Sequence, residues 1–148
     1  MTSKGSIKIE IMKQGKSQIL IIAILVGLTV WSCKKEDINI DITSNNWEVV
    51  KIKIQGESTY TKAKESYVLE FVSDTTYTFN LDVNNCGGHY EIVNNGNINI
   101  SVMGCTEICC DSEFAENLAN LLPKMTAYYG KGTELIFEGQ GEIFLKQH

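Results

Sequence analysis

The sequence predicts a mainly β, α+β domain, a small antiparallel β-barrel or curved sheet of about eight strands with one helix inserted after the fifth strand. Apolar and polar residues alternate along most of the chain after residue 46, and short Asn-, Asp- or Gly-containing turns separate the alternating segments. Only residues 111–122 carry apolar side chains at helical spacing. Short connections imply that consecutive strands pair antiparallel.

The strands follow from period-two alternation. The first begins at Trp47, and the polar residues 55–65 are expected to form a loop. Two hairpins follow, turning at residues 73–75 and at residues 94–96. The expected strands cover residues 47–52, 67–71, 77–83, 89–93, 97–103, 125–129, 134–138 and 142–146.

One amphipathic helix is predicted over residues 111–122. Asp111 is the predicted N-cap, and Pro123, the only proline, ends the helix. Its apolar stripe consists of Phe114, Leu118, Leu121 and Leu122.

The N-terminal segment is typical of an export signal. Residues 19–30 (ILIIAILVGLTV) are apolar and follow a lysine-rich stretch. Twelve residues are too few for a permanent helical span, which needs about 20, but they suit a signal-peptide core. Translation from Met12 instead of Met1 would give a more typical basic region before that core.

Residues 30–33 (VWSC) resemble a bacterial lipobox, although Trp31 replaces the usual small residue. The resemblance implies that residues 1–32 are removed and that Cys33 carries a diacyl group and an acylated amino terminus. The alternative is an ordinary secretory signal with an incidental cysteine.

Residues 34–37 (KKED) resemble the lysine-then-acid signal of surface lipoproteins in the Bacteroidetes, and they also suit a solvated tether. We therefore expect a lipidated tether over residues 33–45 and one β-rich domain over residues 46–148. The expected location is the cell envelope, lipid-anchored in the outer membrane, with surface exposure as the narrower prediction.

The charge of the exported part restricts its partners. Residues 33–148 hold nine lysines, no arginine and seventeen acids, a net charge of −8. This composition argues against nucleic acid, which is recognised by basic surfaces rich in arginine. The expected partners are the membrane, through the N-terminal lipid, and either an envelope protein or a small apolar ligand; the chain is expected to be a monomer.

Four cysteines of the exported domain, Cys86, Cys105, Cys109 and Cys110, are expected to form two disulfides. A bond between the adjacent Cys109 and Cys110 would close a strained ring. Cys86 is therefore expected to pair with either Cys109 or Cys110, and Cys105 with the other.

Metal and catalytic interpretations have less support. The cysteines and His89 offer up to five zinc ligands, but their spacing matches no standard zinc knuckle and an oxidising compartment disfavours free thiolates. A reactive dithiol usually needs a C-x-x-C pair, which the sequence lacks. It also lacks the common hydrolase, phosphate-loop, metalloprotease and dinucleotide motifs. We expect no catalytic residue, metal site or cofactor.

A closed barrel would allow a second function. Tyr77, Phe79, Ile98 and Ile100 alternate along two expected strands and would line an internal cavity. Such a cavity would favour a lipocalin-like carrier of a small apolar ligand. A filled core with an exposed apolar patch would favour a protein-interaction module.

The order of these features resembles the META, or HslJ-like, domain family of bacterial envelope proteins. The matching features are Trp47 on the first strand, residues 84–90 (NNCGGHY), a hairpin, residues 106–110 (TEICC), the helix and a final strand pair. A lipocalin-like lipoprotein family is the near alternative. The META resemblance implies a compact β-rich envelope domain, no enzymatic activity and a Cys86–Cys110 crosslink.

Overall fold

The computed structural model describes residues 40–94 and 96–148. The expected signal peptide, Cys33 and residues 34–39 of the expected tether lie outside the described residues. The described elements, in chain order, are η1 (Ile42–Ser44), β1 (Trp47–Ile54), β2 (Thr61–Lys62), β3 (Val68–Phe71), β4 (Thr76–Asn80), β5 (Asn85–Asn94), β6 (Asn97–Cys105), α2 (Glu113–Leu121), η2 (Leu122–Lys124), β7 (Met125–Lys131), β8 (Glu134–Gly139) and β9 (Gly141–Gln147).

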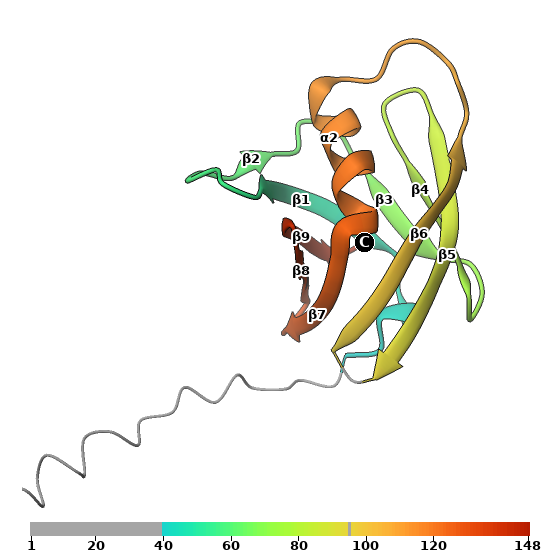
Figure 1. The fold of residues 1–148 in the computed structure, drawn as a ribbon, viewed down its shortest axis with the longest axis vertical. Helices are drawn as coiled ribbons and strands as arrows, with labels where there is room; N and C mark the ends of the chain where they lie inside the picture. Colours follow the sequence, from blue (N-terminus) through green and yellow to red (C-terminus); the bar gives the residue numbers. More distant parts are fainter. Residues whose placement is uncertain (1–39, 95) are drawn as a thin grey trace, which may run out of the picture. The chain divides into compact units, whose positions relative to one another are not determined.

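Eight of these strands form a closed antiparallel barrel, which confirms the predicted fold class (Figure 1). The strand order is β1-β3-β4-β5-β6-β7-β8-β9, and β9 pairs with β1 to close the ring. β2 is an additional two-residue strand on β1, in the segment predicted to be a loop. β6 and β7 share a single residue pair, Asn97 with Ala127, and diverge beyond it. The helix α2 connects these two diverging strands (Figure 1).

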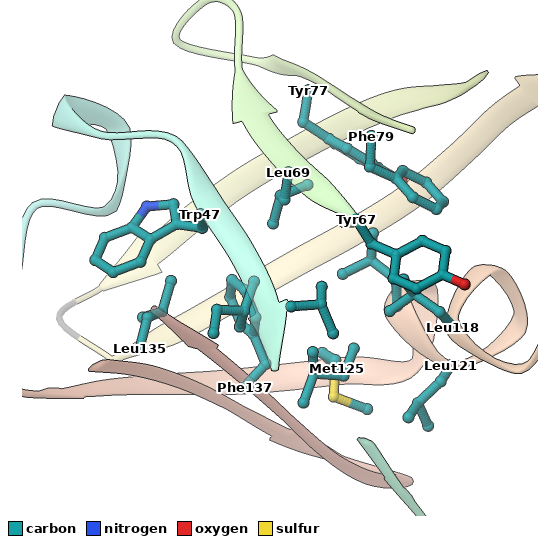
Figure 2. Close-up of a cluster of buried hydrophobic side chains, with 14 of the residues drawn as sticks. Trp47, Tyr67, Leu69, Tyr77, Phe79, Leu118, Leu121, Met125, Leu135 and Phe137 are labelled. Carbon is teal, nitrogen blue, oxygen red and sulfur yellow. The ribbon is translucent and has the colours of Figure 1, made fainter. Parts of the chain in front are cut away.

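The barrel interior is a packed apolar core (Figure 2). Leu135, Phe137 and Ile143 of the last hairpin are 0% exposed, and Trp47 of β1 is 1% exposed. The helix contributes Leu118 and Leu121 to this core, as its apolar stripe predicts. Burial of this apolar surface is the main term that stabilises the fold.

The tether prediction is wrong for residues 40–45, which belong to the domain. Ile42 is 0% exposed, and its carbonyl accepts a hydrogen bond of 2.7 Å from Nε1 of Trp47. The Asp41 side chain caps η1 by accepting a bond from the Thr43 amide. The apolar residues Ile40 and Ile42 are too few to show a periodic pattern among polar neighbours, although each packs on the barrel.

Several strands are longer than predicted, β5 most of all, since it begins at Asn85 and not at residue 89. Two other boundaries differ because of the hydrogen bonds that Asp111 makes. β4 ends at Asn80 instead of residue 83, and the helix N-cap is Ser112 instead of Asp111. The Asp111 carboxylate accepts bonds from the backbone amides of Val83 and Asn84 at 3.0 and 3.4 Å, which holds that segment in a turn. Ser112 then takes the cap position, accepting a bond from the Ala115 amide.

Among the described residues, no helix is long and apolar enough to cross a bilayer.

Candidate functional site

The four domain cysteines form two disulfides, but with pairings that the sequence analysis did not expect. Cys86 of β5 is bonded to Cys105 of β6, and Cys109 is bonded to Cys110 in the following loop. The Cys86–Cys110 crosslink implied by the family resemblance is therefore wrong in this structure. Zinc binding at the cluster would first require reduction of these bonds, because thiolates are the ligands of zinc.

Strand register explains the Cys86–Cys105 pair. From Ile92 to Gly88, each residue of β5 lies opposite its partner on β6 in one constant register, and Gly88 faces Val102. A bulge then shifts the register by one residue, so that Cys86 lies opposite Cys105 instead of Gly104. The two adjacent glycines, Gly87 and Gly88, suit either a bulge or a tight turn, and the structure has the bulge.

Asn84 organises the loop between β6 and α2. Its side-chain amide donates to the Ile108 carbonyl at 2.7 Å and to Oδ2 of Asp111 at 2.6 Å. Its side-chain oxygen accepts from Thr106 Oγ1 and from the Ile108 amide, each at 2.8 Å. Asn84 is the buried polar residue of the described core, at 7% exposure. Both donors and both acceptor positions of the amide are satisfied, as the burial of a polar group requires.

A second polar cluster lies beside the first, at the N-terminus of α2. The Tyr67 hydroxyl donates to Oδ1 of Asp82 at 2.6 Å and lies 3.3 Å from Oγ of Ser112. The Ser112 amide donates to Oδ2 of Asp82, also at 2.6 Å. The Tyr67 ring stacks on Phe114 of the helix, with 5.0 Å between ring centroids. These contacts fix α2 against β3 and β4.

The pKa values of Asp82 and Asp111 fit a structural role for these carboxylates. Hydrogen bonds from Ser112 and Tyr67 lower the pKa of the Asp82 carboxyl. Burial acts to raise the pKa of Asp111, but the bonds from Val83 and Asn84 outweigh it, and the net pKa is lowered. A general acid or base at neutral pH requires a pKa near 7, so both carboxylates are displaced in the wrong direction for that role.

The predicted ligand-binding residues lie in the packed core. Tyr77, Phe79 and Ile98 are 1–3% exposed, and Ile100 is partly buried against them. Burial raises the pKa of Tyr77 to about 12, and its hydroxyl donates to the Ser101 carbonyl at 3.1 Å. The internal void next to Phe79 holds about 10 Å³, about the space of one water molecule. These residues therefore form core contacts, and the void beside Phe79 has no room for an apolar ligand.

His89, the other ligand considered for zinc, is exposed on β5 with Nδ1 3.3 Å from the Thr75 carbonyl. Within residues 40–94 and 96–148, no three acidic, histidine or cysteine side chains gather in a group that could hold a metal ion.

An open groove of about 850 Å³ lies on the surface beside α2. We call it the helix-side groove; its lining residues fall within residues 54–67, 80–82 and 112–117. Its volume lies in the range of ligand sites in proteins. Tyr67, Asp82 and Ser112, which form the cluster described above, are part of this lining.

Tyr60 directly precedes two residues of the groove lining, Thr61 and Lys62, and holds this part of the chain on the barrel. Its ring packs edge-on against Phe144 of β9 at 5.1 Å, and its hydroxyl donates to Glu142 at 2.8 Å. The Lys51 ammonium lies 4.5 Å from the Tyr60 ring centroid and 4.2 Å from that of Phe144. These contacts fix the loop before β2 to the barrel.

Sequence reasoning did not identify Asn84 or the residues of this groove. Strand periodicity places Tyr67 in the core but carries no information on its hydroxyl. The only sequence signal for Asn84 was its place at the start of residues 84–90, which the family resemblance singled out.

Comparisons with known proteins agree with this architecture. Among solved structures, a DUF4847 family protein from Bacteroides vulgatus ATCC 8482 has a similar fold, with a TM-score of 0.54. The two sequences are 12% identical, and the similarity covers 72% of this chain and 94% of that one. A comparison with curated protein sequences finds no match. The META domain family matches residues 40–147, which span the whole barrel, and confirms the resemblance found in the sequence. The chain therefore belongs to the META domain family.

Proposed function

We propose that this protein is a lipid-anchored component of the bacterial cell envelope, and that its META barrel is a non-catalytic module that binds a segment of another envelope protein. The observation that carries the binding role is the contrast between a packed interior and an open helix-side groove. Anchoring is supported by the lipobox-like sequence that ends at Cys33.

The lining of the groove favours a polypeptide segment over a lipid. Lys62 and Lys64 contribute ammonium groups to the lining, while Glu57, Glu65 and Glu113 contribute carboxylates. Each of these five side chains is exposed. Apolar contact is offered by Ile54, Leu81 and Phe114 on the same lining. Mixed charge around a small apolar surface is complementary to a chain segment with both kinds of side chain.

Site-specific photocrosslinking in intact cells tests the groove. A photoreactive side chain at Asn117 lines the groove, whereas one at Asn120 lies exposed on the same helix outside it. We expect a discrete protein adduct from position 117, none from position 120, and loss of the adduct when Lys62 and Lys64 are both changed to Glu. Equal adducts from both positions, or no adduct from position 117, would contradict the binding role.

Metabolic labelling with palmitate tests the anchor. The wild-type protein is expected to take up label, and Cys33→Ser is expected to take up none. Cys110→Ser is the matched control and should label as the wild type does. Equal labelling of the Cys33→Ser and wild-type proteins would refute anchoring at Cys33.

A further inference from the structure

The disulfide between Cys109 and Cys110 lies in the loop that leads from β6 to α2 (Figure 1). Both residues are exposed, so a reactant can approach this bond from solvent. The two cysteines have a sequence separation of 1, so their bond closes no loop of the chain. It therefore lacks the loop-closure entropy by which a disulfide usually stabilises a fold.

The other disulfide, between Cys86 and Cys105, differs in both respects. Cys86 is 3% exposed and belongs to the core, and the bond joins paired strands across a sequence separation of 19. Thiol–disulfide exchange is slow where access is blocked and where the leaving thiol has a high pKa. Attack at the exposed Cys105 would have to release the buried Cys86 sulfur as a thiolate, and burial in apolar surroundings raises a thiol pKa. One bond is therefore protected from exchange, and the other is open to it.

Asn84 holds the chain on both sides of the Cys109–Cys110 pair. Its side chain donates to the Ile108 carbonyl at 2.7 Å and accepts from the Ile108 amide at 2.8 Å. It also donates to Oδ2 of Asp111 at 2.6 Å. The two cysteines thus lie between two residues that are bonded to the same side chain. Their crosslink restricts the backbone there, and opening it restores rotational freedom that opposes these hydrogen bonds.

The residue after Asp111 connects this loop to the helix-side groove. Ser112 is the N-cap of α2, and its amide donates to Asp82 at 2.6 Å. Its hydroxyl lies 3.3 Å from the Tyr67 hydroxyl. Ser112, Asp82 and Tyr67 all line the groove. A loop that is released at Asp111 therefore loosens part of the groove lining.

We propose that Cys109–Cys110 is a redox-active disulfide that a protein dithiol of the C-x-x-C kind reduces, and that its reduction loosens the loop held by Asn84 and the adjoining groove. A thiolate of the dithiol attacks one of the two sulfurs and breaks the S–S bond, so that the other cysteine leaves as a thiolate. The second thiol of the dithiol then attacks the mixed disulfide and releases the first cysteine. Two electrons and two protons pass to the cysteine pair, and the dithiol becomes a disulfide. The inference uses the shape of the groove and does not depend on the partner proposed for it.

Differential alkylation tests which bond is reduced. The folded, oxidised protein is treated with reduced thioredoxin, a C-x-x-C protein, for increasing times and is then blocked with N-ethylmaleimide. The remaining disulfides are reduced with dithiothreitol and labelled with iodoacetamide. Cleavage after Glu91, Glu107 and Glu113 places the adjacent pair on a peptide of its own and separates the two cysteines of the other disulfide.

We expect Cys109 and Cys110 to be reduced at least about tenfold faster than Cys86 and Cys105. Equal rates, earlier reduction of the Cys86–Cys105 bond, or failure of thioredoxin to reduce either bond would overturn the proposal.

Amide hydrogen exchange, followed by NMR, tests the coupling to the groove. The oxidised protein is compared with the protein in which only the Cys109–Cys110 bond is reduced. The amides of Ile108 and Ser112 donate to side chains across the loop, and they should exchange several-fold faster after reduction. The Tyr90 amide donates to a backbone carbonyl in the sheet and is the control, which should not change.

The variant with both Cys109→Ser and Cys110→Ser shows whether these changes come from this bond. Thioredoxin should leave its exchange rates unchanged at all three amides. Faster exchange at Ile108 and Ser112 in the treated variant, or unchanged exchange at both amides in the reduced wild-type protein, would overturn the coupling.

Discussion

Asn84→Asp is expected to break two of the hydrogen bonds that hold the loop between β6 and α2 in place. The change keeps the oxygen that accepts bonds from Thr106 and Ile108 but replaces both N–H donors with an acceptor oxygen. That oxygen would face the Ile108 carbonyl and Asp111 Oδ2, which lie 2.7 and 2.6 Å from the present nitrogen. The new oxygen at position 84 would then face two other hydrogen-bond acceptors and no donor. One of these two is the Asp111 carboxylate, whose pKa is lowered, so it is ionised at neutral pH.

The magnitude follows from the four bonds of Asn84. A hydrogen bond contributes about 0.5–1.5 kcal/mol net, and water can replace part of each lost bond because Thr106 and Ile108 are exposed. Asn84→Ala is therefore expected to lower the free energy of unfolding by about 2–3 kcal/mol. Asn84→Asp is expected to cost at least as much at neutral pH, because it adds a second carboxylate. Near pH 4 a proton shared between the two carboxylates should restore one bond and part of that loss.

Urea denaturation followed by Trp47 fluorescence, at neutral and acid pH, measures these effects. Asn85→Asp is the matched control, since it adds the same charge one position away on an exposed side chain. A surface substitution of this kind changes stability by about 0.5 kcal/mol or less. If Asn84→Asp costs no more than Asn85→Asp, or shows no recovery in acid, the assignment of Asn84 as the organiser of the loop is wrong.

Three further predictions concern the strands and the acid response. Removing the disulfide with Cys86→Ala and Cys105→Ala together should cost about 3 kcal/mol in urea denaturation, because the bond closes a loop with a sequence separation of 19; an unchanged midpoint would contradict the pairing. The pKa of Asp111 is lower in the folded protein than its unfolded value of about 3.9, so the ionised carboxylate stabilises the fold above that pH and the stabilisation is lost as the pH falls below it. Asp111→Asn should therefore lower the melting temperature at neutral pH. It should also make the melting temperature fall less steeply in acid. Gly88→Ala should lower the free energy of unfolding by about 1–3 kcal/mol, because a Cβ there would overlap the backbone of β6. Gly104→Ala is the control in the same melting experiment. It should change stability little, because nothing lies near its Cβ position.

Much of the fold could be predicted from the sequence because each strand buries one face in the barrel, and one-sided burial gives an alternation of apolar and polar residues. Alternation along residues 76–80 and the helical stripe at Leu118 and Leu121 report burial directly, and burial is what the barrel requires. The short turns then imply antiparallel pairing, which the structure confirms throughout the described sheet.

The disulfide pairing could not be predicted from periodicity. It depends on one extra residue in β6 that shifts the register between Gly88 and Cys86. Without that bulge Cys86 would face Gly104, and Cys105 would lie one position away. Apolar alternation has the same period on both sides of a bulge, so the pattern does not locate the shift.

The groove and the polar clusters were missed for a related reason. They are built from contacts between residues far apart in sequence, such as Tyr67 with Ser112 and Asn84 with Asp111. The sequence around an asparagine such as Asn84 does not tell whether its side chain is buried with all its hydrogen bonds made or exposed to water. Only the folded arrangement distinguishes the two.

Intact mass of the protein purified from membranes, before and after reduction and alkylation, tests the account most directly. The account predicts a chain that begins at Cys33, carries added acyl mass and gains four alkyl groups only after reduction. A chain without acyl mass would contradict the envelope anchor on which the proposed function rests. Alkylation of four cysteines without reduction would contradict the two disulfides seen in the structure.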